Sequence, residues 1–95
     1  MFAGVDLVVS GHSHIYQRTG VRERPIYAIV GGGGGRLENR KSGRVENYKD
    51  FYQITLVKFH YVRIKVTRGP SNNYFEWKAV DLEGNTMDSF TLLPQ

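Results

Sequence analysis

Cysteine is absent from this 95-residue sequence, which excludes disulfide bridges and thiolate metal ligands and leaves the redox compartment open. The sequence also has no run of about 20 apolar residues, so it predicts no membrane-spanning helix and no membrane partner. No segment combines helical periodicity with capping residues, and helices are therefore not expected. With 40% hydrophobic and 23% charged residues, the chain has the composition of a folded protein, and the patterning described below makes it mainly β.

The basic residues are concentrated in one part of the chain. The net charge is +4, and residues 18–49 alone hold eight basic and three acidic residues, a local excess of 8 − 3 = +5. Such an excess is typical of a solvated surface loop, and it is also typical of the rim of an anion-binding site. Both interpretations stay open. Within it, residues 36–50 have almost no apolar content and predict a flexible basic loop.

Two short apolar runs occupy the first third of the chain. Val5–Val9 and Ile26–Val30 show no alternation of apolar and polar residues, which predicts strands covered on both faces. Gly31–Gly35 closes the second run. Because such strands need helices or a second sheet to cover them, the sequence looks like part of a larger domain.

The remainder has the alternation typical of antiparallel strands. Apolar residues fall on even positions over 52–56 and again over 62–66, which predicts two strands around a short turn. Further strands are expected over Tyr74–Leu82 and Thr86–Leu93, with a turn at Glu83–Asn85. Phe75 and Trp77 share one face of the first of these strands and are expected in the core.

Two histidines follow the first apolar run in the stretch SGHSHIYQRT. His12 and His14 stand at positions i and i+2 behind Gly11, and side chains with this spacing point to the same side of an extended chain. Imidazole suits zinc, iron and manganese, and two such groups can serve adjacent ions of a two-metal hydrolytic site. The sequence therefore predicts that His12 and His14 are metal ligands.

A family resemblance supports this prediction. VDLVVSGHSHIYQRT (Val5–Thr19) closely resembles the last signature block of the calcineurin-like metallophosphoesterases. Tyr16 and Arg18 match the purple acid phosphatase-type branch, whose block reads G-H-x-H-x-Y-x-R after an apolar strand. GNTMDSF (Gly84–Phe90) is similar to the G-x-x-x-D-x-F pattern near the end of that family's domain.

The resemblance implies a fold, an activity and a ligand set. Residues 1–95 would be the C-terminal part of the catalytic domain, an incomplete piece of a four-layer αββα sandwich. The parent enzyme would hydrolyse a phosphate ester with two metal ions (Fe, Mn or Zn). His12 would bind the second ion and His14 the first. Tyr16, Arg18, Gly11 and Arg36 would lie in the second shell or on the substrate side.

The ligand set of that family is not complete in this sequence. Its upstream blocks, D-x-H, a G-D block and N-H-[DE], have no counterpart, and His60 is the only other histidine. Two imidazoles cannot complete a four-coordinate site. We therefore expect the remaining ligands on a missing N-terminal part of the catalytic domain, or on a second chain in a homo-oligomer, and we expect this chain to be inactive alone.

Two other functions compete with this interpretation. Phe59–Arg68 interleaves aromatic and basic residues, as a β-sheet module that stacks nucleobases would. A self-associating structural β domain is the second alternative. At the level of single residues, His60 is expected at a strand turn, Asp6 in a structural ion pair, and Phe75 with Trp77 in the core.

Overall fold

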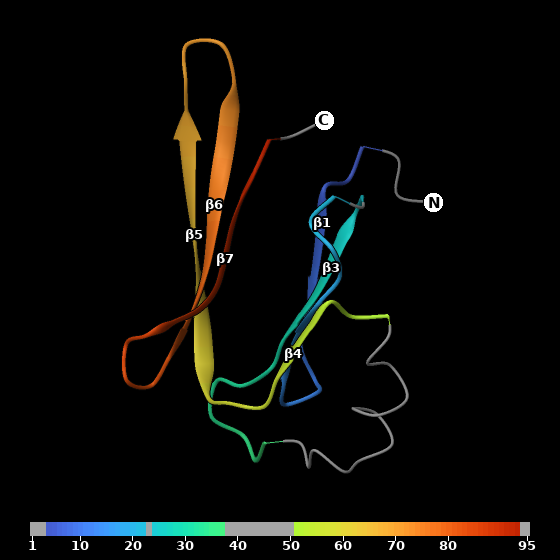
Figure 1. The fold of residues 1–95 in the computed structure, drawn as a ribbon, viewed down its shortest axis with the longest axis vertical. Coiled ribbons are helices and arrows are strands. Elements are labelled where there is room, and N and C mark those ends of the chain that lie inside the picture. Colours follow the sequence, from blue (N-terminus) through green and yellow to red (C-terminus); the bar gives the residue numbers. More distant parts are fainter. Residues whose placement is uncertain (1–3, 23, 38–50, 94–95) are drawn as a thin grey trace.

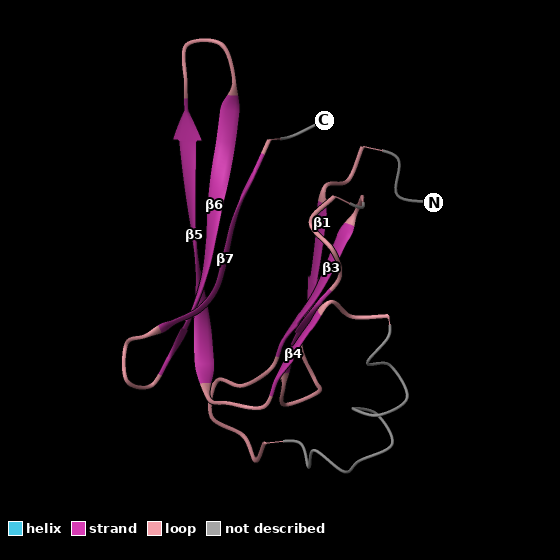
Figure 2. Ribbon diagram, viewed as in Figure 1, coloured by secondary structure: helices cyan, strands magenta, loops and turns pink. Residues whose placement is uncertain are grey.

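The computed structural model describes residues 4–22, 24–37 and 51–93, and over these ranges the chain forms seven strands in two sheets and no helix (Figure 2). The mainly β prediction is confirmed. Within the described ranges, no helix is long and apolar enough to span a membrane. The expected flexible loop, 36–50, lies outside the described residues except for Arg36 and Leu37.

The first sheet contains four strands in the order β1-β3-β2-β4. Strands β1 (Leu7–Ser10) and β3 (Ile26–Val30) are parallel, so the two apolar runs lie side by side. Strand β2 (Tyr16–Arg18) runs antiparallel to β3 and, on its other side, to β4 (Ile54–Leu56). The histidine loop therefore joins the edge strand β1 to an inner strand of the same sheet.

The second sheet is an antiparallel meander of β5 (His60–Arg68), β6 (Asn73–Asp81) and β7 (Thr86–Leu92). Alternating apolar positions fix its register, with Ile64 opposite Trp77 across the first pair. The two sheets diverge in Figure 1, so the far end of the β5–β6 hairpin extends away from the first sheet.

The turn between β6 and β7 is where the sequence predicts one. The Oδ1 atom of Asp81 accepts hydrogen bonds from the backbone amides of Glu83 and Asn85, at 3.0 and 2.9 Å. Gly84 adopts a φ of 83°, which a residue with a side chain rarely adopts. These contacts close the turn.

The core joins the two sheets. Tyr16 and Ala28 from the first sheet pack with Trp77 and Ala79 from the second, and the Trp77 and Phe90 rings stack with centroids 5.4 Å apart. The expectation that Trp77 belongs to the core is confirmed, since its exposed fraction is 1%. Phe75, expected with it, is only partly buried and is not a member of this cluster.

One expectation about strand pairing is wrong, and one strand was not expected. The strands over 52–56 and 62–66 do not form a hairpin, because β4 pairs with β2 and β5 pairs with β6. Strand β2 was not expected, because two of its three residues, Gln17 and Arg18, are polar. Strand β1 is partly uncovered within the described residues, since Val9 is 50% exposed, and the sequence led us to expect its cover outside this chain. The described residues form two sheets and no helix, so the four-layer αββα arrangement remains a proposal.

Candidate functional site

The histidine pair lies in a tight turn between β1 and β2. The amide of Ser13 donates to the carbonyl of Gly11 at 2.9 Å, and the amide of Ile15 donates to the carbonyl of Ser13 at 2.8 Å. His12 has a φ of 73°, in the left-handed region. The argument from an extended chain is therefore wrong, although both histidines stay in one short loop.

The glycine run after β3 packs against this turn. A Cβ atom at Gly31 would overlap the backbone carbonyl of Ser13, so only glycine fits at this approach. A Cβ atom at Gly35 would stand 2.5 Å from Cε1 of His14. The glycines thus let the backbone pass close to His14.

His14 is held through one of its ring nitrogens. Its Nδ1 atom is 2.5 Å from the backbone carbonyl oxygen of Arg36. Because a carbonyl only accepts, Nδ1 carries the proton, and the lone pair of the neutral ring is on Nε2. Metal-binding histidines are commonly oriented in this way. Arg36 contributes its backbone, and its side chain is exposed.

His12 is exposed, and His14 is partly buried. Over the ranges that the structure describes, no third histidine or carboxylate joins them in a group that could hold a metal ion. The two histidines could supply part of a metal centre. The His12 imidazole is exposed, and the His14 imidazole is oriented by the Arg36 carbonyl. The remaining ligands would have to come from elsewhere.

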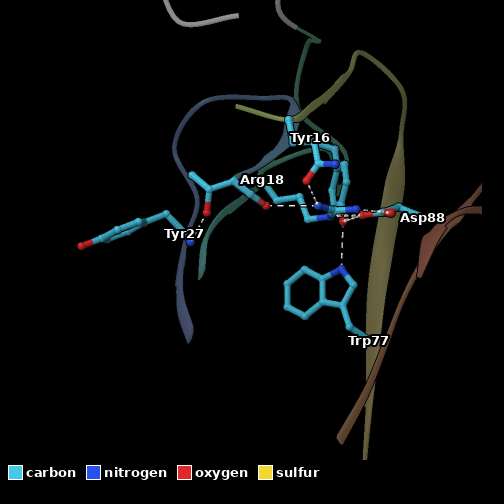
Figure 3. A network of polar contacts seen from close by, with 7 residues as sticks. Tyr16, Arg18, Tyr27, Trp77 and Asp88 are labelled. Atoms are coloured by element: carbon cyan, nitrogen blue, oxygen red, sulfur yellow. Dashed lines mark hydrogen bonds and ion pairs between the residues drawn. The ribbon is translucent and has the colours of Figure 1, made fainter. Parts of the chain in front are cut away.

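Tyr16 and Arg18 form a buried network with residues of the second sheet (Figure 3). The Tyr16 hydroxyl donates to Oδ2 of Asp88 at 2.5 Å and accepts from Nε1 of Trp77 at 2.8 Å. Arg18 donates from Nε to Oδ2 at 2.6 Å and from Nη2 to Oδ1 of Asp88 at 2.9 Å. The network connects β2, directly after the histidine loop, to β6 and β7.

The network shifts the ionisation of its members. Burial and the contact with Asp88 raise the pKa of Tyr16. The hydrogen bond to Asp88 raises the pKa of Arg18, despite its burial. Burial alone would raise the pKa of Asp88, but hydrogen bonds from Arg18 and Tyr16 outweigh it and lower the pKa below its ordinary value. A neutral phenol and an ion pair are therefore the stable states.

These contacts show what Tyr16 and Arg18, which were expected near the metal ligands or the substrate, touch in the structure. Within the described residues, the Tyr16 hydroxyl bonds to Asp88 and Trp77. Arg18 donates to Asp88, to the carbonyl of Thr19 and to Gln53, and neither side chain bonds to the two histidines. The ion pair between Arg18 and Asp88 is buried and does not lie on the surface. Asp88 was missed as a partner, although it is the acidic residue of GNTMDSF.

Comparison of the chain with protein-family models, with curated proteins and with solved structures finds no significant match. Function must therefore be inferred from the loop, its histidines and the network that anchors the following strand.

Two other residues have the structural places expected of them. His60 is the first residue of β5, and its Nδ1 donates to the carbonyl of Lys58 at 2.7 Å. Its ring lies edge-on to Tyr16, with centroids 5.3 Å apart. Asp6 and Arg24 form an ion pair, with 3.9 Å between Oδ1 and Nε.

Proposed function

We propose that this chain is the C-terminal part of a two-metal phosphoesterase of the purple acid phosphatase type, with His12 and His14 as metal ligands. The observation that carries the proposal is the contact between Nδ1 of His14 and the carbonyl of Arg36, which leaves Nε2 as the coordinating atom. The G-H-x-H-x-Y-x-R block gives the reaction class by its resemblance to that family.

The chain's own residues prepare the ligands. Gly31 allows the turn to pack against the end of β3, and the Arg36 carbonyl fixes the His14 ring. The pair of Arg18 and Asp88 holds β2, on which the turn ends. When bound, the two metal ions would polarise the phosphoester and supply a bound hydroxide near neutral pH.

The proposed metal centre needs residues that this sequence does not contain. The other ligands would lie on a preceding part of the same catalytic domain, whose strands and helices would complete a four-layer αββα sandwich. Two features are consistent with such a continuation: β1 is an edge strand in the described sheet, where a further strand can pair, and Val9 leaves apolar surface for a covering element. The chain alone would then bind metal weakly and hydrolyse no phosphate ester.

Titration with Mn²⁺ tests the ligand assignment without an activity assay. In an ¹⁵N-labelled sample, the paramagnetic ion should broaden the amide resonances of the turn, Gly11 to Ile15, and of Arg36 first. The double variant His12→Ala/His14→Ala should lose this selective broadening. The variant His60→Asn is the control, because it removes a histidine outside the turn and should leave the broadening unchanged.

The contrary result is equally clear. Broadening that persists in the double variant, or that centres on the acidic turn around Asp81 and Glu83, would mean that the histidines do not bind metal. The proposed function would then lose its main support.

A further inference from the structure

Strand β5 divides its apolar and basic residues between the two faces of the second sheet. Val62 packs against the core that joins the sheets. Because side chains alternate along a strand, Tyr61, Arg63 and Lys65 project to the opposite face, which we call the outer face. All three side chains are exposed, and the exposed fraction of Tyr61 is 56%. The interleaved residues of Phe59–Arg68 are thus sorted by the fold, with the aromatic and basic ones together on the outer face.

The outer face carries an excess of positive charge. Arg63 lies directly opposite Lys78 of β6, and Lys65 is the next residue of β5 on this face. Glu76, opposite Lys65, is the one acidic residue that strands β5, β6 and β7 place there. These four side chains are exposed, and within the described residues none of them forms an ion pair. The face therefore has a net charge of 3 − 1 = +2.

The position of Arg63 opposite Lys78 is unfavourable for the chain by itself. Directly opposite residues of an antiparallel pair have Cβ atoms about 4.5–5.5 Å apart, and like charges at this distance repel each other. A partner with negative charges would relieve the repulsion. Arg63 and Lys65 are two residues apart, about 6.8 Å along the strand, so the face offers a row of cations and not a single charged point.

The aromatic residue on this face distinguishes between anionic partners. Single-stranded nucleic acid combines phosphates with unpaired bases, and such bases stack on aromatic side chains of β-sheets. Tyr61 precedes Arg63 by two residues, so a ring and two cations follow one another along β5. An anionic membrane fits less well, because membrane insertion needs apolar side chains on the basic face, and Ile64 and Val66 project to the other one. Carboxylates alone, as in an acidic peptide, would leave the Tyr61 ring without a partner.

We infer that the outer face of the second sheet binds single-stranded nucleic acid. Its phosphates lie on the basic side chains Arg63, Lys65 and Lys78. One of its bases stacks on Tyr61. Binding has little dependence on base sequence, because charge pairing and stacking do not read the edges of the bases. The histidine turn belongs to the other sheet, so this inference does not depend on the proposed metal centre.

The contribution of the basic residues can be measured by fluorescence anisotropy with a labelled oligo(dT) of about 12 nucleotides, within the usual site size. With three phosphate contacts, the logarithm of the association constant should fall with the logarithm of salt concentration at a slope of about −2, since each contact contributes about −0.7. Arg63→Gln should reduce the slope to about −1.4 and weaken binding about fivefold at about 0.1 M salt. Arg22→Gln is the matched control, because it removes the same charge from an exposed position between β2 and β3. It should leave the slope unchanged.

The contribution of stacking needs a separate variant. Tyr61→Leu keeps an apolar side chain but removes the ring, and it should weaken oligo(dT) binding about fivefold or more without changing the salt slope. Phe51→Leu is the control, because Phe51 is 59% exposed and lies outside the second sheet. The bases of a DNA duplex are already stacked on one another, so duplex binding should be insensitive to Tyr61→Leu.

Equal oligo(dT) affinities of Arg63→Gln and Arg22→Gln would overturn the inference, because the net charge of +4 would then explain the binding. Equal affinities of Tyr61→Leu and Phe51→Leu would remove the stacked base and overturn it as well. The same variants should be compared on vesicles of phosphatidylcholine and phosphatidylserine and on poly-glutamate. If either of these binds as tightly as oligo(dT) and is weakened equally by Arg63→Gln and Tyr61→Leu, the face does not select nucleic acid and the inference is wrong.

Discussion

Asp88 accepts both hydrogen bonds that the Arg18 guanidinium directs toward it, at 2.6 Å from Nε and 2.9 Å from Nη2, across 70 positions of sequence. A buried ion pair is weak support for stability by itself, because desolvation offsets much of the attraction. Its geometry, however, is specific, and a bidentate pair tolerates little displacement. We therefore interpret the pair as a device that fixes β2 and the end of the histidine turn against the second sheet.

Removing the acid should be costly. Asp88→Ala leaves the Arg18 guanidinium buried without its partner, and breaking such a pair costs about 3–5 kcal/mol. Urea denaturation should show this loss in the free energy of unfolding. Ser89→Ala, at an exposed neighbouring position of β7, is the control and should change it by less than about 0.5 kcal/mol. Equal stabilities of the two variants would contradict the interpretation.

The Tyr16 hydroxyl should contribute separately. Tyr16→Phe keeps the ring but leaves Nε1 of Trp77 without its acceptor and removes one donor to Asp88, for an expected loss of about 1–3 kcal/mol. The fluorescence of Trp77, the only tryptophan, should report the change in its surroundings. An unaltered emission spectrum together with unaltered stability would show that the hydroxyl has no role in the network.

The sequence predicted strands better than it predicted their partners. Apolar runs and period-two alternation located six of the seven strands, because both patterns reflect burial of a strand face. Alternation says which face is buried but not which strand lies alongside, so β4 and β5 were wrongly expected to pair. Strand β2 was missed because Arg18, polar and buried, has its partner Asp88 far away in the sequence.

For the candidate site, local pattern was informative and distant contact was not. The pattern singled out His12 and His14, but the extended conformation inferred from their spacing is wrong, because they lie in a tight turn. The Arg36 carbonyl was not foreseeable, because any residue can present its backbone to His14.

The pH dependence of stability should reveal Asp88 at low pH. Its folded-state pKa is lowered, so its contribution to stability is present above the ordinary carboxyl pKa of 3.8. That contribution is lost as pH falls through the lower pKa of the folded state. Thermal unfolding between about pH 2 and 5 should therefore show a steeper loss for the natural chain than for Asp88→Asn. Parallel curves would mean that the contacts of Asp88 do not lower its pKa in the folded state.

Two glycines offer a matched test of the packing behind the turn. Gly31→Ala places a methyl group on the backbone of Ser13, and overpacking of this kind costs about 1–3 kcal/mol. Gly33→Ala meets open space and should leave stability within about 1 kcal/mol of the natural chain. If both variants unfold at the same urea concentration, the close approach of Gly31 to Ser13 is not important for stability.

The last prediction concerns the orientation of His14. In Gly35→Ala, the added Cβ would stand 2.5 Å from Cε1 of His14, so the ring must move away from the Arg36 carbonyl. Loss of a contact that orients a metal ligand commonly lowers metal affinity about 10-fold or more. The apparent Mn²⁺ affinity, taken from broadening of the turn amides, should fall accordingly. Gly34→Ala is the control, because its Cβ meets nothing within 4 Å, and it should keep the natural affinity. Because both substitutions add one methyl group to neighbouring residues of the same run, a difference between them would isolate the position of the imidazole as the cause.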